Sequence, residues 1–156
     1  MSVNHPLQGV LDGMRVLDLT QVLAGPYCTM LLADHGADVI KIEPPGGDVA
    51  RGMGLFHASD TEKRHAGYFH SVNRNKRSIV LDLKNADDAA TFRAMARQAD
   101  VVVENYRVGV MERLGLSYES LREENPRLVY AAVRGFGDPR TGRSPYADWP
   151  AFDIVA

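Results

Sequence analysis

The sequence predicts an α/β fold, built on an open, Rossmann-like parallel sheet with flanking helices. Three observations predict it. Short aliphatic segments alternate with helix-like segments along the whole chain of 156 residues. Glycine or proline follows several of the helix-like segments. The last two aliphatic segments are nearly continuous apolar runs, which is typical of strands covered on both faces of a parallel sheet. We therefore expect right-handed crossovers between neighbouring strands.

Five segments have the composition of strands. The first is weakly alternating and the second alternates clearly between apolar and polar residues. The predicted strands are residues 15–19 (RVLDL), 38–43 (DVIKIE), 78–83 (SIVLDL), 100–104 (DVVVE) and 127–134 (RLVYAAVR).

Four segments between these strands are predicted helices: residues 26–35, 85–98, 108–114 and 117–125. The second is the clearest, because Asn85 can cap its N-terminus and Asp87 and Asp88 suit the positive end of its dipole. Gly36, Gly115 and Pro126 are natural stops for the other three. Residues 44–77 and 135–150 are expected to be irregular, and loops of that length are usually functional.

The composition indicates one soluble domain in the cytoplasm. The net charge of −2 gives no general attraction to nucleic acid, and the densest basic run, NRNKRS at residues 73–78, is short. No apolar run approaches the roughly 20 residues that cross a bilayer. The single cysteine, Cys28, fits a reducing compartment, and we expect it to be a small buried core residue.

Ligands of open parallel sheets bind beyond the carboxyl ends of the strands. The first of these loops contains one glycine, Gly25, followed by Pro26 and Tyr27. A dinucleotide turn needs three glycines, so NAD and FAD are disfavoured, and the phosphate-binding P-loop motif is absent. Scattered lysines and arginines in the other loops nevertheless suggest a rim that attracts phosphate.

Several long motifs, in order, resemble the N-terminal portion of family III CoA transferases. They are LDLTQVLAGPYCTMLLADHGADVIKIEPPGGD, NRNKRSIVLDLK, ADVVVENYRVGVMERLGLSYESLREENPRLVYAAVRGFG and PYADWPAFDIVA. That family includes formyl-CoA transferase, carnitine CoA-transferases and α-methylacyl-CoA racemase. The resemblance implies that residues 1–156 are the N-terminal part of a CoA-binding large domain. The rest of that domain and a small domain would then be absent from this chain, and the full enzyme would be an interlocked homodimer.

The resemblance also implies which residues contact coenzyme A. These are Leu23, Ala24, Leu81, Asp82, Leu83, Lys84, Asn105, Tyr106, Arg107, Arg113, Pro150, Ala151, Phe152 and Asp153. Lys84, Arg107 and Arg113 are sensible partners for the phosphates of CoA, and Tyr106 can cover the adenine or the pantetheine arm.

The family transfers CoA between an acyl-CoA and a carboxylic acid, with an aspartate as the nucleophile and no metal. The matching aspartate would follow Ala156, so we expect this chain alone to be inactive and assign it no catalytic residue. A racemase-like isomerase is disfavoured because Phe152 stands where that branch has a proton-transferring histidine. A non-catalytic CoA-binding or assembly module that needs a second chain remains open. Leu23 and Pro44 depart from formyl-CoA transferase, which favours a different acid pair.

Overall fold

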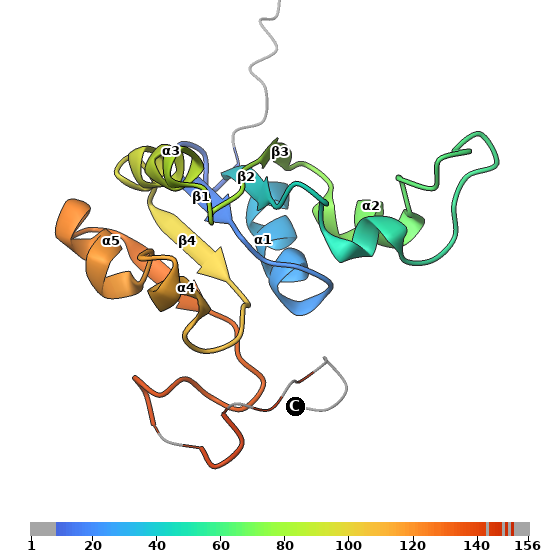
Figure 1. The fold of residues 1–156 in the computed structure, drawn as a ribbon. Helices are drawn as coiled ribbons and strands as arrows, with labels where there is room; N and C mark the ends of the chain where they lie inside the picture. The colour runs from blue at the N-terminus through green and yellow to red at the C-terminus, as the bar shows by residue number, and fades with distance from the viewer. Residues whose placement is uncertain (1–8, 143, 148, 150, 152–156) are drawn as a thin grey trace, which may run out of the picture.

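The chain forms a five-stranded sheet in which every neighbouring pair of strands is parallel, which confirms the predicted α/β class (Figure 1). The computed structural model describes residues 9–142, 144–147, 149 and 151. The strands are β1 (Arg15–Asp18), β2 (Asp38–Glu43), β3 (Arg77–Val80), β4 (Val101–Glu104) and β5 (Val129–Ala132), in the spatial order β3-β2-β1-β4-β5. The chain therefore builds outward from β1 in one direction and then returns to build outward from β1 in the other.

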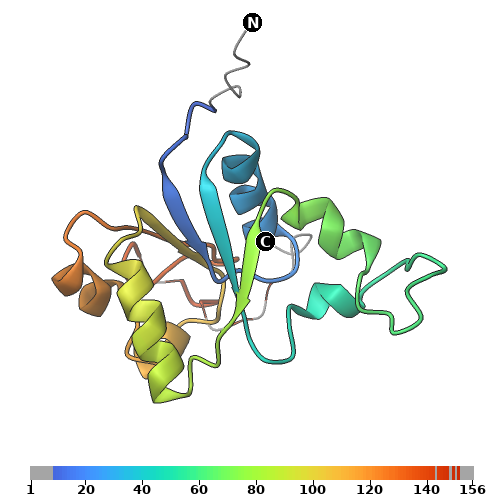
Figure 2. The same ribbon diagram turned by 90° about the horizontal axis from the view of Figure 1, so that it is seen from above.

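Helices cover both faces of the sheet (Figure 2). They are α1 (Ala24–Asp34), η1 (Val49–Gly52), α2 (Gly67–Asn73), α3 (Ala86–Ala96), α4 (Val110–Arg113) and α5 (Tyr118–Glu124). Because side chains alternate along a strand, Val16 and Leu17 face opposite sides of the sheet. Val16 belongs to a cluster with Ala33 of α1, and Leu17 to a larger cluster with Phe92 of α3 and Leu121 of α5. Within the described ranges, none of these helices combines the length and apolar character needed to span a bilayer.

The predicted strands and helices all form, although several are shorter than expected. The third strand was predicted to reach residue 83 but ends at Val80. Leu81 still donates its N–H to Glu43 across the sheet, at 2.9 Å, but the Asp82 N–H is donated to the Asp88 carboxylate of α3, at 2.8 Å. This side-chain acceptor turns the chain away from the sheet. The fifth strand is an edge strand among the described residues, and its Val129 is exposed.

Two sequence-based expectations were wrong. Residues 44–77 contain η1 and α2, and α2 packs beside α1 with Phe69 and Val72 buried. The two apolar residues are spaced by three, which suits one face of a helix, but a helix of 7 residues gives little periodic signal. Cys28 is exposed, because the inward side of α1 carries Thr29 and Met30.

Helix α3 begins with the predicted cap. The Asn85 carboxamide oxygen accepts the N–H groups of Asp87 at 2.8 Å and Asp88 at 3.3 Å. Asn85→Ala removes this acceptor, so the free energy of unfolding should fall by about 1 kcal/mol in urea titrations. Asn85→Ser, which keeps a capping oxygen, should remain close to the unmodified protein. Equal losses in both variants would contradict a capping role.

Candidate functional site

The loops that follow β1 and β4 leave the sheet at the point where its strand order reverses. Successive connections run in opposite directions from this point, so the two loops separate and leave a crevice. Gln21 to Ala24 follow β1, and Asn105 to Arg107 follow β4. In open α/β sheets this crevice is the usual place for a ligand. Two hollows occupy it.

The larger hollow has a volume of about 460 Å³ and extends from the crevice toward β2 and α4. Aliphatic side chains make up much of its wall, with one lysine and one arginine among them. Its lining residues are Gln21, Ile42, Glu43, Pro44, Leu81, Asp82, Leu83, Lys84, Tyr106, Val110, Arg113 and Leu114.

The smaller hollow has a volume of about 230 Å³ and lies against the start of α1. Its lining residues are Gln21, Val22, Leu23, Ala24, Asn105, Tyr106 and Ala151. Gln21 and Tyr106 therefore line both hollows. Burial raises the pKa of the Tyr106 hydroxyl, while a hydrogen bond with the Gln21 side chain acts in the opposite direction. This pair contributes to the walls of both hollows.

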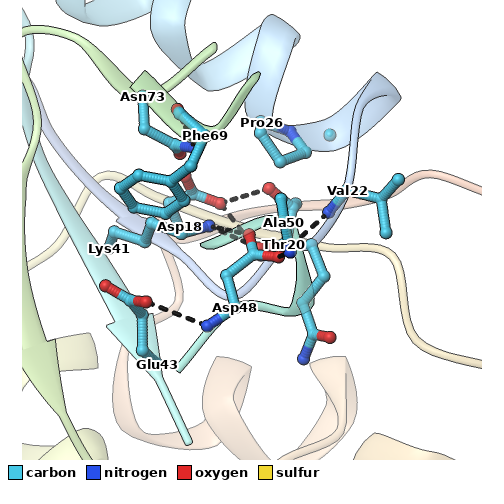
Figure 3. A network of polar contacts seen from close by, with 12 residues as sticks. Asp18, Thr20, Val22, Pro26, Lys41, Glu43, Asp48, Ala50, Phe69 and Asn73 are labelled. Atoms are coloured by element: carbon cyan, nitrogen blue, oxygen red, sulfur yellow. Dashed lines mark hydrogen bonds and ion pairs between the residues drawn. The ribbon is translucent and has the colours of Figure 1, made fainter. Parts of the chain in front are cut away.

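A buried ion pair lies against the loop after β1 and supports it (Figure 3). Lys41 of β2 and Asp48, the residue before η1, have side chains that are each 1% exposed, and their charged atoms lie 2.9 Å apart. This contact is an ion pair rather than a well-directed hydrogen bond, since Oδ2 of Asp48 has no hydrogen-bond partner among the described residues. The Lys41 ammonium donates instead to the Thr20 carbonyl at 2.7 Å. The pair thus joins β2 to the loop after β1.

Asp18, at the end of β1, organises the other side of the same loop. Its carboxylate accepts the Thr20 N–H at 2.9 Å, the Thr29 hydroxyl at 2.7 Å and the Lys76 ammonium at 3.0 Å. Burial lowers the pKa of Lys76, and the negative charge of Asp18 opposes that effect. Asp18 therefore binds the backbone of the loop, and both of its carboxylate oxygens already accept hydrogen bonds.

Glu43 connects this network to the surface. Arg51 donates two hydrogen bonds to its carboxylate, both at 2.7 Å, and the Asp48 N–H donates at 3.0 Å. The Arg51 guanidinium also lies 3.8 Å from the ring centroid of Phe69. Burial by itself would raise the pKa of Glu43, but the hydrogen bonds from Arg51, Ser78 and the Asp48 amide outweigh it and lower the pKa to about 2.

The loop held in this way has an unusual backbone. Val22 has φ of 69°, in the left-handed region that β-branched residues rarely adopt. Such a conformation costs on the order of 1–3 kcal/mol and persists only where the surroundings enforce it. Gly25 lies against Thr20 so closely that a Cβ atom would fall 2.4 Å from the Thr20 side chain. The single glycine of this turn therefore lets α1 approach the loop.

Comparison with known proteins identifies the chain. The sequence profile of CoA-transferase family III matches residues 11–156. The chain belongs to this family. It is 56% identical over 148 residues to succinyl-CoA:mesaconate CoA-transferase of Haloarcula hispanica, covering 95% of this chain and 37% of that protein. It is 50% identical over 149 residues to acetyl-CoA:oxalate CoA-transferase of Acetobacter aceti, covering 95% of this chain and 36% of that one.

A solved structure gives the same assignment. The crystal structure of a CAIB/BAIF family protein from Brucella suis superposes with a TM-score of 0.85 at 40% identity, covering 95% of this chain and 38% of that one. The chain therefore spans little more than a third of the length of the relatives that it matches, and corresponds to an N-terminal portion of them.

Most of the residues that the family resemblance predicted as CoA contacts gather around the two hollows. Residues 81–84 and Arg113 line the larger hollow, Leu23, Ala24, Asn105 and Ala151 line the smaller one, and Tyr106 lines both. Arg107 is exposed and lines neither hollow. Pro150, Phe152 and Asp153 lie outside the described residues. Whether these residues bind CoA remains a prediction.

Gln21, which lines both hollows, was not among the residues predicted from the sequence. No local motif marks a glutamine in such a loop, and only the folded arrangement shows its position. Three histidines lie in the long loop of residues 44–77: His65 and His70 stack on one another, and His57 contacts Ser59. Among the described residues, no three histidine, cysteine or acidic side chains are grouped as metal ligands.

The Glu43 network makes stability depend on pH in a defined direction. Its folded pKa of about 2 lies below its usual value of 4.5, so the charged form stabilises the fold above pH 4.5. This contribution is lost as the pH falls toward 2. At about 1.4 kcal/mol per pKa unit, it amounts to something on the order of 3 kcal/mol.

Glu43→Gln should therefore lower the free energy of unfolding at pH 7 and flatten its decline between pH 4.5 and 2, as measured by urea unfolding at a series of pH values. Glu62→Gln is the matched control, because the Glu62 side chain is 69% exposed. Its pH profile should parallel that of the unmodified protein. A Glu43→Gln profile that also ran parallel would contradict the assigned role.

Proposed function

We propose that this chain is the CoA-binding portion of an acyl-CoA:carboxylate CoA-transferase. One observation carries the proposal: two hollows that share Gln21 and Tyr106 lie at the strand-order reversal of a family III chain. In this proposal CoA lies across both hollows, passing the Gln21–Tyr106 pair. The single-glycine turn at Gly25 fits such a ligand, because no dinucleotide pyrophosphate has to approach the backbone there.

The chemistry of the larger hollow suits the parts of CoA. Its volume of about 460 Å³ falls within the range of small-molecule pockets. Leu81, Leu83 and Val110 offer apolar contact to the pantetheine arm or the adenine ring. Lys84 and Arg113 are exposed at its rim, where their charges can meet phosphate groups without prior desolvation. This combination of apolar wall and cationic rim matches a long, largely uncharged arm with a phosphorylated end.

The proposed reaction uses a carboxylate nucleophile from outside these 156 residues. An aspartate carboxylate attacks the acyl-CoA carbonyl carbon, the carbon–sulfur bond breaks, and an aspartyl anhydride and the CoA thiolate result. The thiolate then attacks the aspartyl carbonyl and releases the donor acid. The acceptor carboxylate attacks the aspartyl-CoA thioester formed in this way, its carbon–sulfur bond breaks, and a second anhydride and the CoA thiolate result. The thiolate then attacks the acceptor's acyl carbon, which gives the new CoA thioester and frees the aspartate. The part played by this chain is to bind CoA and hold its thiol end in place.

The relatives suggest the class of acid. Their names include mesaconate, oxalate, succinate and glutarate, all of which are dicarboxylates. We propose a dicarboxylate substrate for the complete protein, and a homodimer acting in the cytoplasm. Support for further packing partners comes from both sheet edges, where Val80 of β3 is 57% exposed and Val129 of β5 is 58% exposed.

CoA binding is directly measurable by isothermal titration of the 156-residue chain. Lys84→Ala and Arg113→Ala should each raise the dissociation constant about tenfold, which is the effect of losing one charge-assisted contact. Arg107→Ala should raise the dissociation constant by a smaller factor, because Arg107 lines neither hollow. Arg127→Ala is the matched control, since Arg127 is exposed and precedes β5, at the end of the sheet away from the hollows. Equal effects at Lys84 and Arg127, or no CoA binding by folded protein, would refute the proposal.

A second experiment tests the division of roles. The purified chain, given succinyl-CoA and a second dicarboxylate, should produce no new CoA thioester by mass spectrometry, because the proposed nucleophile lies elsewhere. Exchange should occur in the complete protein. Turnover by the 156-residue chain itself would show that the nucleophile is within it.

A further inference from the structure

The loop after β1, which lines both hollows, is held from two sides around Val22, whose backbone is left-handed. On one side, Lys41 donates to the Thr20 carbonyl at 2.7 Å, and Oδ1 of Asp48 lies 3.4 Å from the Val22 amide nitrogen. On the other side is Asn105, from the loop after β4. Val22, with φ of 69°, lies between these two supports. Without them, a valine would return to the extended or right-handed region.

Asn105 supports the loop through both ends of its side-chain amide. Its Oδ1 accepts the Gln21 N–H at 2.9 Å, and its Nδ2 donates to the Gln21 carbonyl at 2.8 Å. Both ends of the side-chain amide thus bind the main chain of one residue, in the way a neighbouring strand would. One Nδ2 hydrogen and one Oδ1 lone pair are left, but the side chain is fixed in orientation by its two backbone contacts.

We propose that Asn105 is a positioning residue, which holds Gln21 so that Val22 stays left-handed and the loop keeps the shape that binds the ligand. The inference rests on the proposed binding of CoA, and it gives Asn105 a role different from the direct contact that the family resemblance implies. The two loops at the strand-order reversal are then one unit, because the loop after β4 sets the backbone of the loop after β1. Gln21, which lines both hollows, is the residue placed by this unit.

A double-mutant cycle separates positioning from direct contact. Asn105→Ala should weaken CoA binding about tenfold, because the left-handed backbone loses one of its supports. Val22→Gly removes one side chain from the wall of the smaller hollow but adopts positive φ readily, so its dissociation constant is the reference for the double variant. The double variant should recover most of the loss, since glycine no longer needs Asn105 to reach that conformation. A direct contact between Asn105 and CoA would show no such recovery.

The outcomes distinguish this inference from the function on which it rests. Absence of CoA binding by the unmodified, folded chain would refute the proposed function. Binding by the unmodified chain together with an unimpaired Asn105→Ala variant, or an unrescued double variant, would refute the positioning role alone. Circular dichroism and thermal unfolding confirm that each variant is folded.

Should Asn105→Ala fail to fold, position 22 still provides the test. Val22→Pro fixes φ near −65° and removes the N–H that faces Asp48, so it should abolish measurable CoA binding while Val22→Gly retains it. Hydrogen exchange without ligand adds an independent reading, because the Gln21 amide should be protected in the unmodified protein. Binding by Val22→Pro as tight as by Val22→Gly would contradict the inference.

Discussion

The buried ion pair between Lys41 and Asp48 is the constraint on which the site depends. Charges with side chains only 1% exposed are tolerated when they are paired, and removing one partner from such a pair typically costs about 3–5 kcal/mol. Here the pair also fixes the loop after β1, through the Thr20 carbonyl and the Val22 amide. Glu43 and Arg51 hold Asp48 in place in turn. The polar network is thus a scaffold for a loop, and its role extends beyond sheet stability.

Strand order places this local scaffold beside the crevice of the candidate site. Because β1 and β4 are neighbours while their connections run in opposite directions, their following loops separate at the end of the sheet. Asn105 bridges the gap from one loop to the backbone of the other. Asn105 lines the smaller hollow, and Gln21 and Tyr106 line both hollows. The site is therefore a product of topology and a few polar contacts, and needs no glycine-rich turn.

The sequence predicted the elements better than the contacts between them. Periodicity and the Asn85 cap are local signals, so α3 and the strands were found, and the order of family motifs led to the residues around both hollows. The network of Asp18, Lys41 and Asp48 was invisible, because it joins residues that are distant in the chain. Helix α2 was missed for a related reason, since its few residues are stabilised by packing on α1 and carry little propensity of their own. Cys28 was misplaced because the weak pattern of α1 did not reveal its exposed side.

The most direct test of this account is hydrogen–deuterium exchange of the chain with and without saturating CoA. Protection should appear in the loop of residues 20–24, at residues 81–84 and in the segment from 105 to 113, all at the carboxyl ends of the strands. Residues 97–100 and 125–128 lie on the opposite edge, at the amino-terminal ends of β4 and β5, and should exchange equally in both states. Protection confined to that opposite edge, or none at all despite measured binding, would show that CoA binds elsewhere and that the crevice beside β1 and β4 is not its site.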